Sequence, residues 1–326
     1  MVVIADESRV SERLLSSGTP SFGEGHEMTV AAAESAFAVE GPPDPELISI
    51  RDLIYRAAGI FHPDAKLSLL RERCGRRMKA LNIVTLRPYL EQLTAEPTGQ
   101  AELIALLNEI TIGETCFFRG QPQLDAFRRV VLGKIVEARQ RAQAGPLRIW
   151  SAGCSTGEEP YTISMALQDE SEGILQGWGF EILATDLNER SLEHARKGIY
   201  GSYSTRYLTD YHKRKYFTRV GGDLQVQPLM RSSIKFARVN LSDERRLMLM
   251  RNFDVIFCRN VLIYFDLTSK RRVIEHLYDS LLPHGYLFLG RSESLFGVSH
   301  DFRLVHLPGA TAYVRADRRR AGRQER

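Results

Sequence analysis

Two adjacent carboxylates, Glu158 and Glu159, follow a glycine-bearing loop in the stretch "SAGCSTGEEP", residues 151–160. Loops of this kind often hold a nucleotide, but this one lacks the lysine that a P-loop places after its second glycine. It also offers only Gly153 and Gly157, where the dinucleotide fingerprint has three glycines. Carboxylates at the start of a helix repel a pyrophosphate and attract a positive group. The loop therefore predicts a site for a cationic ligand.

S-adenosylmethionine is a nucleoside ligand of this kind, because it carries a sulfonium and an amino group. Its ribose hydroxyls require a carboxylate after the second apolar run, where Asp186 stands. Asp186 lies 29 residues beyond Gly157, a longer spacing than the roughly 20 residues of dinucleotide sites. One of the two glutamates is expected only to complement the helix dipole, and we predict that Glu159 is the ligand residue.

Five apolar runs rich in Val, Ile and Phe alternate with helical stretches after about residue 145. This alternation predicts an α/β fold with a mostly parallel, Rossmann-like sheet. Polar residues follow every run: the loop to Glu159, then Asp186, Asn240, Arg259 with Asn260, and Arg291 with Ser292 and Glu293. Open α/β sheets bind ligands beyond the carboxyl ends of their strands, so we expect these residues to line one crevice.

Two segments of the α/β region depart from the alternation. The runs "FRLVHLP" and "AYVRAD" are joined through "GAT" with no room for a helix, which predicts an antiparallel hairpin at one sheet edge. Residues 200–233 mix aromatic and charged residues, and their stretch "RVGGDLQV" predicts a small β insertion with a tight Gly-Gly turn.

Helical periodicity predicts an all-α N-terminal domain with its linker at residues 44–126, before the α/β domain at 127–317. Its clearest helix spans residues 65–82, where an apolar stripe recurs at Leu67, Leu70, Cys74, Met78 and Leu81. Residues 1–43 and the basic tail at 318–326 have no such periodicity, and we expect both to be disordered.

The same helix carries a basic face, formed by Lys66, Arg73, Arg76 and Arg77. This face has two interpretations that the sequence leaves open. It is either a solvated surface whose side-chain stems cover apolar residues, or a docking face for an acidic partner.

Composition limits the class of protein. The chain has 326 residues, 43% of them hydrophobic, and a formal net charge of +4. Its apolar runs are far shorter than the roughly 20 residues of a membrane span, and no signal-peptide pattern opens it. We therefore expect a cytoplasmic protein without membrane insertion. The cysteines form no CxxC pair, so neither a metal site nor a disulfide framework is indicated.

With these residues in place, the chain resembles the CheR family, the chemotaxis receptor methyltransferases that methylate glutamate side chains of receptors. The resemblance covers about residues 48–314 and rests on "TCFFR", "WSAGCSTGEEPYTI", "ATDLN", "RVNL" and "FCRNVLIYF". It implies an S-adenosylmethionine-dependent methyltransferase domain preceded by a smaller all-α domain. The cofactor contacts that it implies fall on Thr115, Arg119, Glu159, Asp186, Asn240, Leu241, Arg259 and Asn260. We add Gly153, because we expect Gly153 and Gly157 to let the backbone approach the cofactor.

The chain departs from the family pattern at two places. Gly113 stands where members commonly have Asn, so a side-chain contact to the cofactor is lost. The turn of the β insertion is shorter than in members whose insertion binds a C-terminal receptor pentapeptide. We therefore predict that this chain does not tether a receptor in that way.

Methyl transfer to glutamate requires no general base, because the acceptor carboxylate is already ionised at pH 7. We expect Arg119 to steady the substrate carboxylate and Tyr264 to donate a hydrogen bond to it, with S-adenosylhomocysteine as the second product. Given the resemblance, Arg73, Arg76 and Arg77 are predicted to dock the acidic helical region of a receptor. We also expect a monomer.

The sequence bears on two rival functions. A nucleic-acid methyltransferase would suit the positive charge, but "RNVLIYF" lacks the Asn/Asp-Pro-Pro-aromatic motif of base-amine methylation, and we found no platform of interleaved aromatic and basic residues. We therefore expect no nucleic-acid partner. A non-catalytic scaffold that binds S-adenosylmethionine would have no need of Arg119 and Tyr264.

Overall fold

The computed structural model describes residues 44–111 and 113–317. The expected disorder of residues 1–43 and 318–326 therefore concerns segments outside the described residues. Within the described ranges, the structure contains no helix that combines the length and the apolar character of a bilayer span.

The described residues begin with the helices α2 (Pro45–Ala58), α3 (Leu67–Ala80), α4 (Leu86–Thr94) and α5 (Gly99–Ile110), with a short 3-10 turn at Asp64–Lys66. The Asp44 side chain caps the start of α2 by accepting backbone hydrogen bonds, and Gly59 ends α2 in the left-handed conformation. In α3, Leu67, Leu70, Cys74 and Met78 are buried as the apolar stripe predicts. Leu81 is instead 37% exposed, because the helix ends one residue before it.

A continuous helical stretch crosses the predicted domain boundary after residue 126. It consists of α6 (Gln121–Ala126), the wider turn η3 (Phe127–Val131) and α7 (Leu132–Arg141). Leu124 and Phe127, on either side of that boundary, belong to the same buried cluster as the sheet residues Ile149 and Phe257. The whole stretch therefore packs with the sheet.

Seven strands of the described residues form the central sheet, in the order β6-β2-β1-β7-β8-β10-β9. They are β1 (Leu147–Ala152), β2 (Phe180–Asp186), β6 (Ile234–Arg238), β7 (Phe253–Cys258), β8 (Leu281–Leu289), β9 (Phe302–Leu307) and β10 (Ala310–Arg315). The first five in this order pair in parallel, whereas β10 pairs antiparallel with both β8 and β9. The predicted α/β fold and its antiparallel edge hairpin are confirmed.

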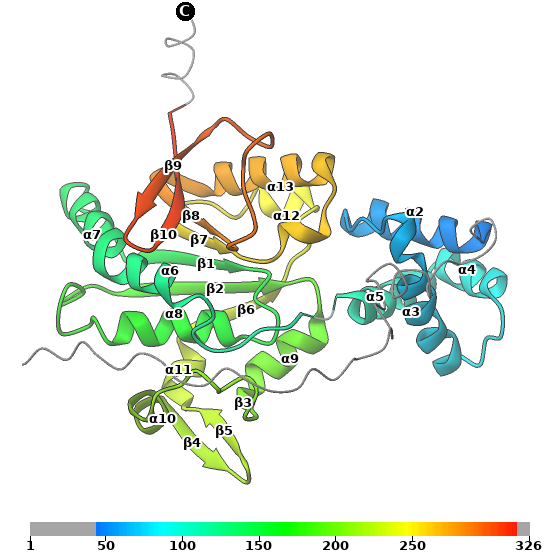
Figure 1. Ribbon diagram of the computed structural model, residues 1–326, viewed down its shortest axis with the longest axis horizontal. Coiled ribbons are helices and arrows are strands. Elements are labelled where there is room, and N and C mark those ends of the chain that lie inside the picture. The colour runs from blue at the N-terminus through cyan, green and yellow to red at the C-terminus, as the bar shows by residue number, and fades with distance from the viewer. Residues whose placement is uncertain (1–43, 112, 318–326) are drawn as a thin grey trace, which may run out of the picture. The chain divides into compact units, whose positions relative to one another are not determined.

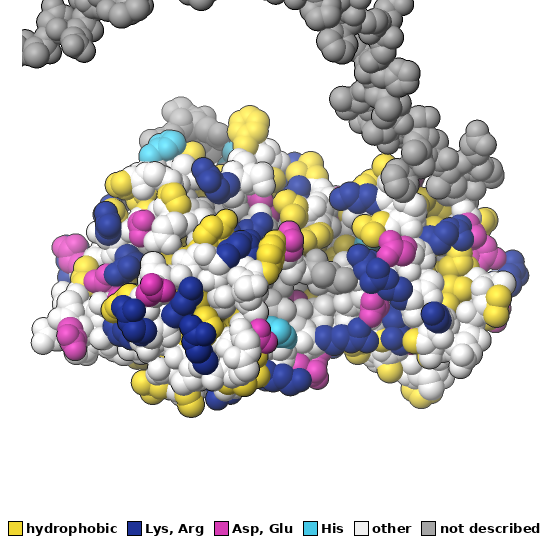
Figure 2. Space-filling view, turned by 60° about the horizontal axis from the view of Figure 1, so that its bottom comes forward, with side chains coloured by type: hydrophobic (Ala, Val, Ile, Leu, Met, Phe, Trp, Pro, Cys, Tyr) yellow, Lys and Arg dark blue, Asp and Glu magenta, His cyan; other side chains and the backbone are white. Residues whose placement is uncertain are grey.

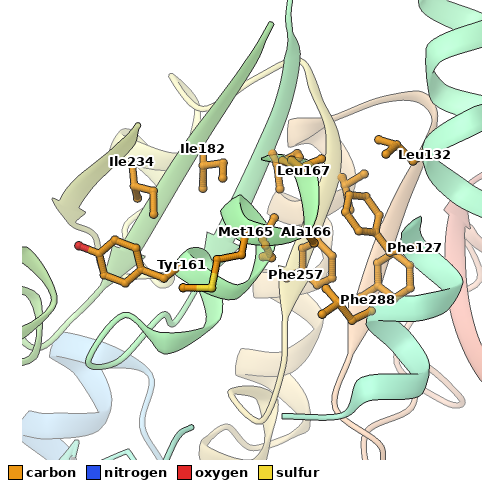
Figure 3. Packing of buried hydrophobic residues seen from close by; sticks show 14 of the residues in the cluster. Phe127, Leu132, Tyr161, Met165, Ala166, Leu167, Ile182, Ile234, Phe257 and Phe288 are labelled. Carbon is orange, nitrogen blue, oxygen red and sulfur yellow. The ribbon is translucent and has the colours of Figure 1, made fainter. Parts of the chain in front are cut away.

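Helices cover both faces of this sheet. Figure 1 shows α8 (Glu158–Gln168) on one face and α13 (Leu267–Ser280) on the other. On the α8 face, side chains from α8, η3 and the strands of the central sheet pack together, as Figure 3 shows for Met165, Phe127, Ile182 and Phe257. Burying each such side chain contributes about 1.5–3 kcal/mol. The α13 face is packed together with α12 (Glu244–Leu247) and with residues of α2 to α5. This packing fixes the strand ends that carry the polar residues.

The predicted β insertion is confirmed. It contains β3 (Ile199–Tyr200), β4 (Phe217–Val220) and β5 (Asp223–Val226), in the order β3-β5-β4. Gly221 and Gly222 form the turn, and Gly221 has a φ of +61°, which favours glycine. The helices near this sheet are α9 (Glu189–Lys197), α10 (Asp210–Tyr216) and α11 (Pro228–Ser232).

Candidate active site

A cavity of about 310 Å³ lies beyond the carboxyl ends of the parallel strands. This volume is in the range of small-molecule sites. The sequence-predicted cofactor and catalytic residues all line it: Thr115, Arg119, Gly153, Glu159, Asp186, Asn240, Leu241, Arg259, Asn260 and Tyr264. The three arginines of the predicted docking face do not. The fold therefore brings the polar residues after β1, β2, β6 and β7 to one cavity, as expected for an open α/β sheet. The expectation is wrong for the residues after β8, because Arg291, Ser292 and Glu293 do not line this cavity.

The helical region supplies part of the cavity wall, which the sequence argument did not anticipate. Ile60, Phe61, His62, Lys66 and Leu69 line the cavity from the segment between α2 and α3 and from the start of α3. Burial lowers the pKa of His62, so its imidazole is neutral at pH 7. Its Nδ1 atom is buried without a hydrogen-bond partner in the described residues. Ile60, Phe61 and Leu69 make this wall partly apolar.

The two glutamates of the loop after β1 point to different partners. Glu158 is 1% exposed and accepts hydrogen bonds from the Thr156 and Ser204 hydroxyls, at 2.7 and 2.8 Å. Glu159 lines the cavity, where its Oε1 accepts from the Ser151 hydroxyl at 2.7 Å. Glu158 thus ties the loop to the β insertion, and Glu159 remains the candidate ligand residue.

The glycines of this loop serve close packing. Gly157 has a φ of +95°, and a Cβ there would lie 2.6 Å from the Cβ of Ala195. At Gly153, with a φ of +76°, a Cβ would lie 2.4 Å from Val261 Cγ2. Gly153 lines the cavity, but Gly157 does not. The expectation that Gly157 lets the backbone approach the cofactor is therefore wrong, because that glycine makes room for α9.

Arg259 organises one side of the cavity through three side-chain hydrogen bonds. Its Nη1 donates to Glu159 Oε2 at 3.1 Å, within an ion pair whose two side chains are only 10% and 15% exposed. Its Nε donates to Gln123 Oε1 at 2.9 Å, and its Nη2 donates to the Arg119 carbonyl at 2.7 Å. The guanidinium thereby joins α8, α6 and the segment before α6, residues 113–120. It also balances the charge of Glu159, so the loop is less anionic than its sequence suggests.

Asp186 is the carboxylate at the end of β2. It accepts backbone hydrogen bonds from Ser155 at 2.7 Å and from Asn188 at 2.8 Å. Burial raises the pKa of Asp186, although these N–H donors favour its ionised form. Each carboxylate oxygen has a second acceptor site, so Asp186 can also accept from a ligand's hydroxyls.

Asn240 connects the cavity wall to α2. Its Nδ2 donates to the Ala57 carbonyl at 2.7 Å, and its Oδ1 accepts from the Ser242 backbone at 2.9 Å. The Ser242 hydroxyl donates to the Ala58 carbonyl at 2.9 Å, which satisfies another carbonyl at the end of α2. These bonds hold the helical wall against the strand end that carries Asn240.

Arg119 and Tyr264 are the two candidate catalytic side chains. The Arg119 Nη1 donates to the Glu114 carbonyl at 2.8 Å, and its side chain is otherwise exposed. Tyr264 is 43% exposed, and partial burial raises its pKa, so its hydroxyl is protonated at pH 7. Both side chains can donate hydrogen bonds to an acceptor in the cavity.

Gly113 faces the same cavity through its backbone. Its carbonyl accepts from the Ser155 hydroxyl at 3.3 Å. A Cβ at this position would lie 2.8 Å from Ser155 Oγ, so a larger residue would displace that hydroxyl.

Comparison with known proteins identifies the family. Residues 113–311 match the family model described as "CheR methyltransferase, SAM binding domain", and residues 45–111 match "CheR methyltransferase, all-alpha domain". The chain belongs to the CheR methyltransferase family. It is therefore an enzyme that uses S-adenosylmethionine, as the residues of the loop and of β2 predicted.

Relatives of this CheR methyltransferase match over most of their length. "Chemotaxis protein methyltransferase 2" of Vibrio cholerae is 36% identical over 274 residues, which cover 83% of this chain and 93% of that protein. The "Chemotaxis protein methyltransferase" of Borreliella burgdorferi is 34% identical, covering 77% and 89% respectively. That of Escherichia coli is 33% identical, covering 83% and 91%.

Arg77, one of the three arginines predicted to dock a partner of the CheR methyltransferase, forms an ion pair inside the helical region. The Nε and Nη2 atoms of Arg77 donate to the Glu102 carboxylate at 3.0 and 2.7 Å, and the Tyr89 hydroxyl donates to the same carboxylate. Glu102 is 7% exposed, so this ion pair joins α3 to α5 inside the helical region. The prediction that Arg77 docks a partner is therefore wrong, because its charge is neutralised within the fold.

The other two arginines of the basic face remain accessible. Arg76 is exposed and pairs with Glu72 one helical turn away, whereas Arg73 is half-buried. Pairs of this exposed i, i+4 kind contribute only about 0.3–0.5 kcal/mol, so a partner's carboxylates can replace Glu72. Figure 2 shows that Lys and Arg side chains gather in several places on one face of the molecule, with acidic side chains among them.

Glu293 supports the site from outside the cavity, a role that its place among the polar residues after β8 did not indicate. Its carboxylate accepts three backbone hydrogen bonds, from Gly290 at 2.6 Å, Asn260 at 2.7 Å and Leu262 at 2.8 Å. Asn260 has a φ of +59°, a conformation that costs free energy for a residue other than glycine. Glu293 therefore holds the segment that leads from β7 to Tyr264.

Replacing Glu293 with Gln should displace this segment. An amide has one acceptor oxygen and a donor NH₂, which would face backbone N–H groups that need acceptors. We expect kcat/KM to fall about tenfold and the free energy of unfolding to fall by about 1–3 kcal/mol. Kinetics and urea unfolding measure the two effects. A variant with unchanged kinetics would show that the segment keeps its shape without Glu293.

Proposed function

We propose that this CheR methyltransferase transfers the methyl group of S-adenosylmethionine to glutamate side chains of chemoreceptors, for chemosensory adaptation. The observation that carries the proposal is one cavity containing a carboxylate for a nucleoside, Asp186, together with two hydrogen-bond donors for an acceptor, Arg119 and Tyr264. The curated relatives that match most of the chain are named chemotaxis protein methyltransferases. A nucleic-acid methyltransferase or a non-catalytic scaffold is not favoured by these relatives.

Within this proposal, the cofactor-binding residues divide by position. Asp186 would accept from the ribose hydroxyls, because it has free acceptor sites beside its bonds to Ser155 and Asn188. Glu159 would face the cationic end of the cofactor, with its orientation fixed by Ser151 and Arg259. The remaining contacts come from residues on the other walls: Thr115, Arg119, Gly153, Asn240, Leu241 and Asn260.

The protein's main contribution to methyl transfer is to position the acceptor carboxylate against the methyl group. When bound, S-adenosylmethionine supplies a methyl group on a sulfonium, which is a good leaving group. Arg119 and Tyr264 would orient the acceptor carboxylate, and the apolar wall at Ile60 and Leu69 would keep water away from it. A carboxylate acceptor is ionised at pH 7, so the cavity requires no general base.

Replacing Tyr264 with Phe tests its assigned role. The ring stays and the hydroxyl donor is lost, so we expect kcat to fall about 10- to 100-fold while the affinity for S-adenosylmethionine changes less than twofold. Steady-state kinetics and calorimetric titration measure these effects. Phe in place of Tyr286, a sheet tyrosine that does not line the cavity, is the matched control. Equal kcat for the wild type and the Tyr264→Phe variant would remove the hydroxyl from the mechanism.

For docking, we propose that the exposed positive charge on α3 orients an acidic helical region of the receptor. Reversing both charges, Arg73→Glu with Arg76→Glu, should raise KM for a receptor fragment about tenfold and leave S-adenosylmethionine affinity intact. The effect should shrink at high salt, because both groups lie at the surface, where ions screen their charge. If both affinities fell together, the variant would have damaged the fold instead.

We further propose that the enzyme acts as a monomer in the cytoplasm, without binding a receptor's C-terminal pentapeptide at β3 to β5.

The methyl-transfer function is tested by incubating the protein with methyl-labelled S-adenosylmethionine and either receptor cytoplasmic fragments or RNA. Label on the fragments that mild base releases as methanol supports a glutamate methyl ester. Base-stable label on RNA would establish the nucleic-acid activity instead, and label on neither would favour a scaffold.

A further inference from the structure

A second cavity, of about 540 Å³, adjoins the active site along the segment before α6. Four residues of this segment line both cavities: Glu114, Thr115, Cys116 and Arg119. The far wall of the second cavity comes from the β-insertion region and from the loop after β8, through Tyr203, Arg206, Tyr207 and Arg291. A ligand in this cavity would therefore lie beside any group held by Arg119.

The second cavity is rich in positive charge that the protein does not neutralise. The Arg206 guanidinium lies 3.9 Å from the ring centroid of Tyr203 and 5.0 Å from that of Tyr207. It donates a hydrogen bond to the Tyr203 carbonyl. Neither Arg206 nor Arg291 forms an ion pair with an acidic residue of the described part of the chain. Glu114 is the acidic residue among those lining the cavity, and it accepts from the Tyr203 hydroxyl at 2.8 Å.

We propose that this cavity is a subsite for an acidic segment of the protein substrate, next to the glutamate that is methylated. This inference rests on the proposed function, since it takes a glutamate in the active site as its starting point. The guanidinium groups of Arg206 and Arg291, which have no acidic partner among the described residues, supply donors that match carboxylates, and Tyr207, which is 60% exposed, lies beside them. Arg206 covers one face of both tyrosine rings, which reduces the surface left for stacking a nucleic-acid base.

The first arm of the test measures binding alone. A fluorescein-labelled peptide of glutamate and alanine is titrated with the full chain at low salt, and a glutamine–alanine peptide of equal length serves as reference. We expect the acidic peptide to bind more tightly, and the double variant Arg206→Glu with Arg291→Glu to weaken it about tenfold. Arg129→Glu, an exposed reversal on η3 that lines neither cavity, should change nothing. S-adenosylmethionine affinity checks the fold, and the milder Arg206→Gln with Arg291→Gln should give a smaller loss.

Equal affinity of the wild type and both double variants for the acidic peptide would overturn the subsite. A single-stranded RNA that binds more tightly than the peptide, and only when both arginines are present, would also overturn it. The second arm measures KM for a receptor cytoplasmic fragment, which we expect to rise about tenfold in the charge-reversed variant. If the wild type methylates no fragment, the proposed function fails, while the peptide titration still decides whether the subsite exists.

Discussion

Replacing Asp186 with Asn should lower the affinity for S-adenosylmethionine about 100-fold. The amide loses the charge that strengthens hydrogen bonds from ribose hydroxyls, each worth about 1.5–3 kcal/mol when one partner is ionised. It also places an NH₂ donor against the backbone N–H of either Ser155 or Asn188, which now donate to the carboxylate at 2.7 and 2.8 Å. Isothermal titration of the folded variant measures the loss.

The matched control is Asp169→Asn, at a carboxylate that accepts from Lys215, Tyr211 and Tyr216 outside the cavity. It should lower stability without changing cofactor affinity.

The pH dependence of S-adenosylmethionine affinity gives a second check on Asp186. The cationic cofactor favours ionised Asp186, so affinity is complete above the pKa of that carboxyl and falls as the pH drops through it. Because burial raises that pKa, the decline should begin at a higher pH than for an exposed Asp. Wild-type affinity as insensitive to acid as that of the variant would contradict the assignment.

Replacing Arg259 with Gln should have the largest effect on stability. The change leaves Glu159, whose side chain is 15% exposed, without its cationic partner, and it removes the donor that Arg259 supplies to Gln123 Oε1 and to the Arg119 carbonyl. Removing one member of a buried ion pair costs about 3–5 kcal/mol, because the other charge stays desolvated. We expect the free energy of unfolding, measured with urea, to fall by about 3 kcal/mol, near the lower end of this range. The value of kcat/KM should fall at least 100-fold, because the segment that carries Arg119 shifts.

A double-mutant cycle separates the ion pair from the other bonds of Arg259. Adding Glu159→Gln to Arg259→Gln removes the unpaired charge, so the double variant should regain about 1–2 kcal/mol of stability but little activity. Arg128→Gln is the matched control, since Arg128 and Glu170 form a half-exposed pair away from the cavity. Its cost should stay below about 1 kcal/mol. Additive losses in the cycle would show that Glu159 and Arg259 do not stabilise each other.

The strand ends were predictable because they follow from short-range patterns. The run at β7 is buried at every position, and its apolar letters alone locate it between the polar residues on either side. Parallel pairing then brings Asp186, Asn240 and Arg259 together beyond the carboxyl ends of the strands, wherever the intervening helices lie. The same reasoning placed the Gly-Gly turn of the β insertion.

Partners distant in the sequence were not predictable from such patterns. Arg77 lies on the expected basic face of α3, yet it turns to Glu102, 25 residues later, because burying that carboxylate requires a cation. Gln123 and Glu293 hold Arg259 and Asn260 in place, but neither residue type signals this role without the fold. The loop sequence predicts that Gly157 lies against the cofactor, whereas in the structure a Cβ at this position would clash with Ala195.

The aromatic and basic residues of the β-insertion region show another limit. Tyr203, Arg206 and Tyr207 follow one another closely in the sequence, but their joint significance depends on the cavity that they share with Arg119 and Arg291. Tyr207 and Arg291 lie 84 positions apart in the chain, and only the fold establishes that they meet in this cavity. Charge clusters of this kind are therefore better assigned from the structure than from spacing.

The central claim is that the acceptor is a glutamate carboxylate of a receptor. It is tested most directly by mass spectrometry of a receptor cytoplasmic fragment after reaction with S-adenosylmethionine, before and after mild base. The account predicts peptides heavier by one methylene unit, with the added mass on a glutamate side chain, lost on base treatment, and not formed by the Asp186→Asn variant at limiting cofactor. A fragment that gains no mass, or gains it on a base-stable nitrogen, would contradict the account.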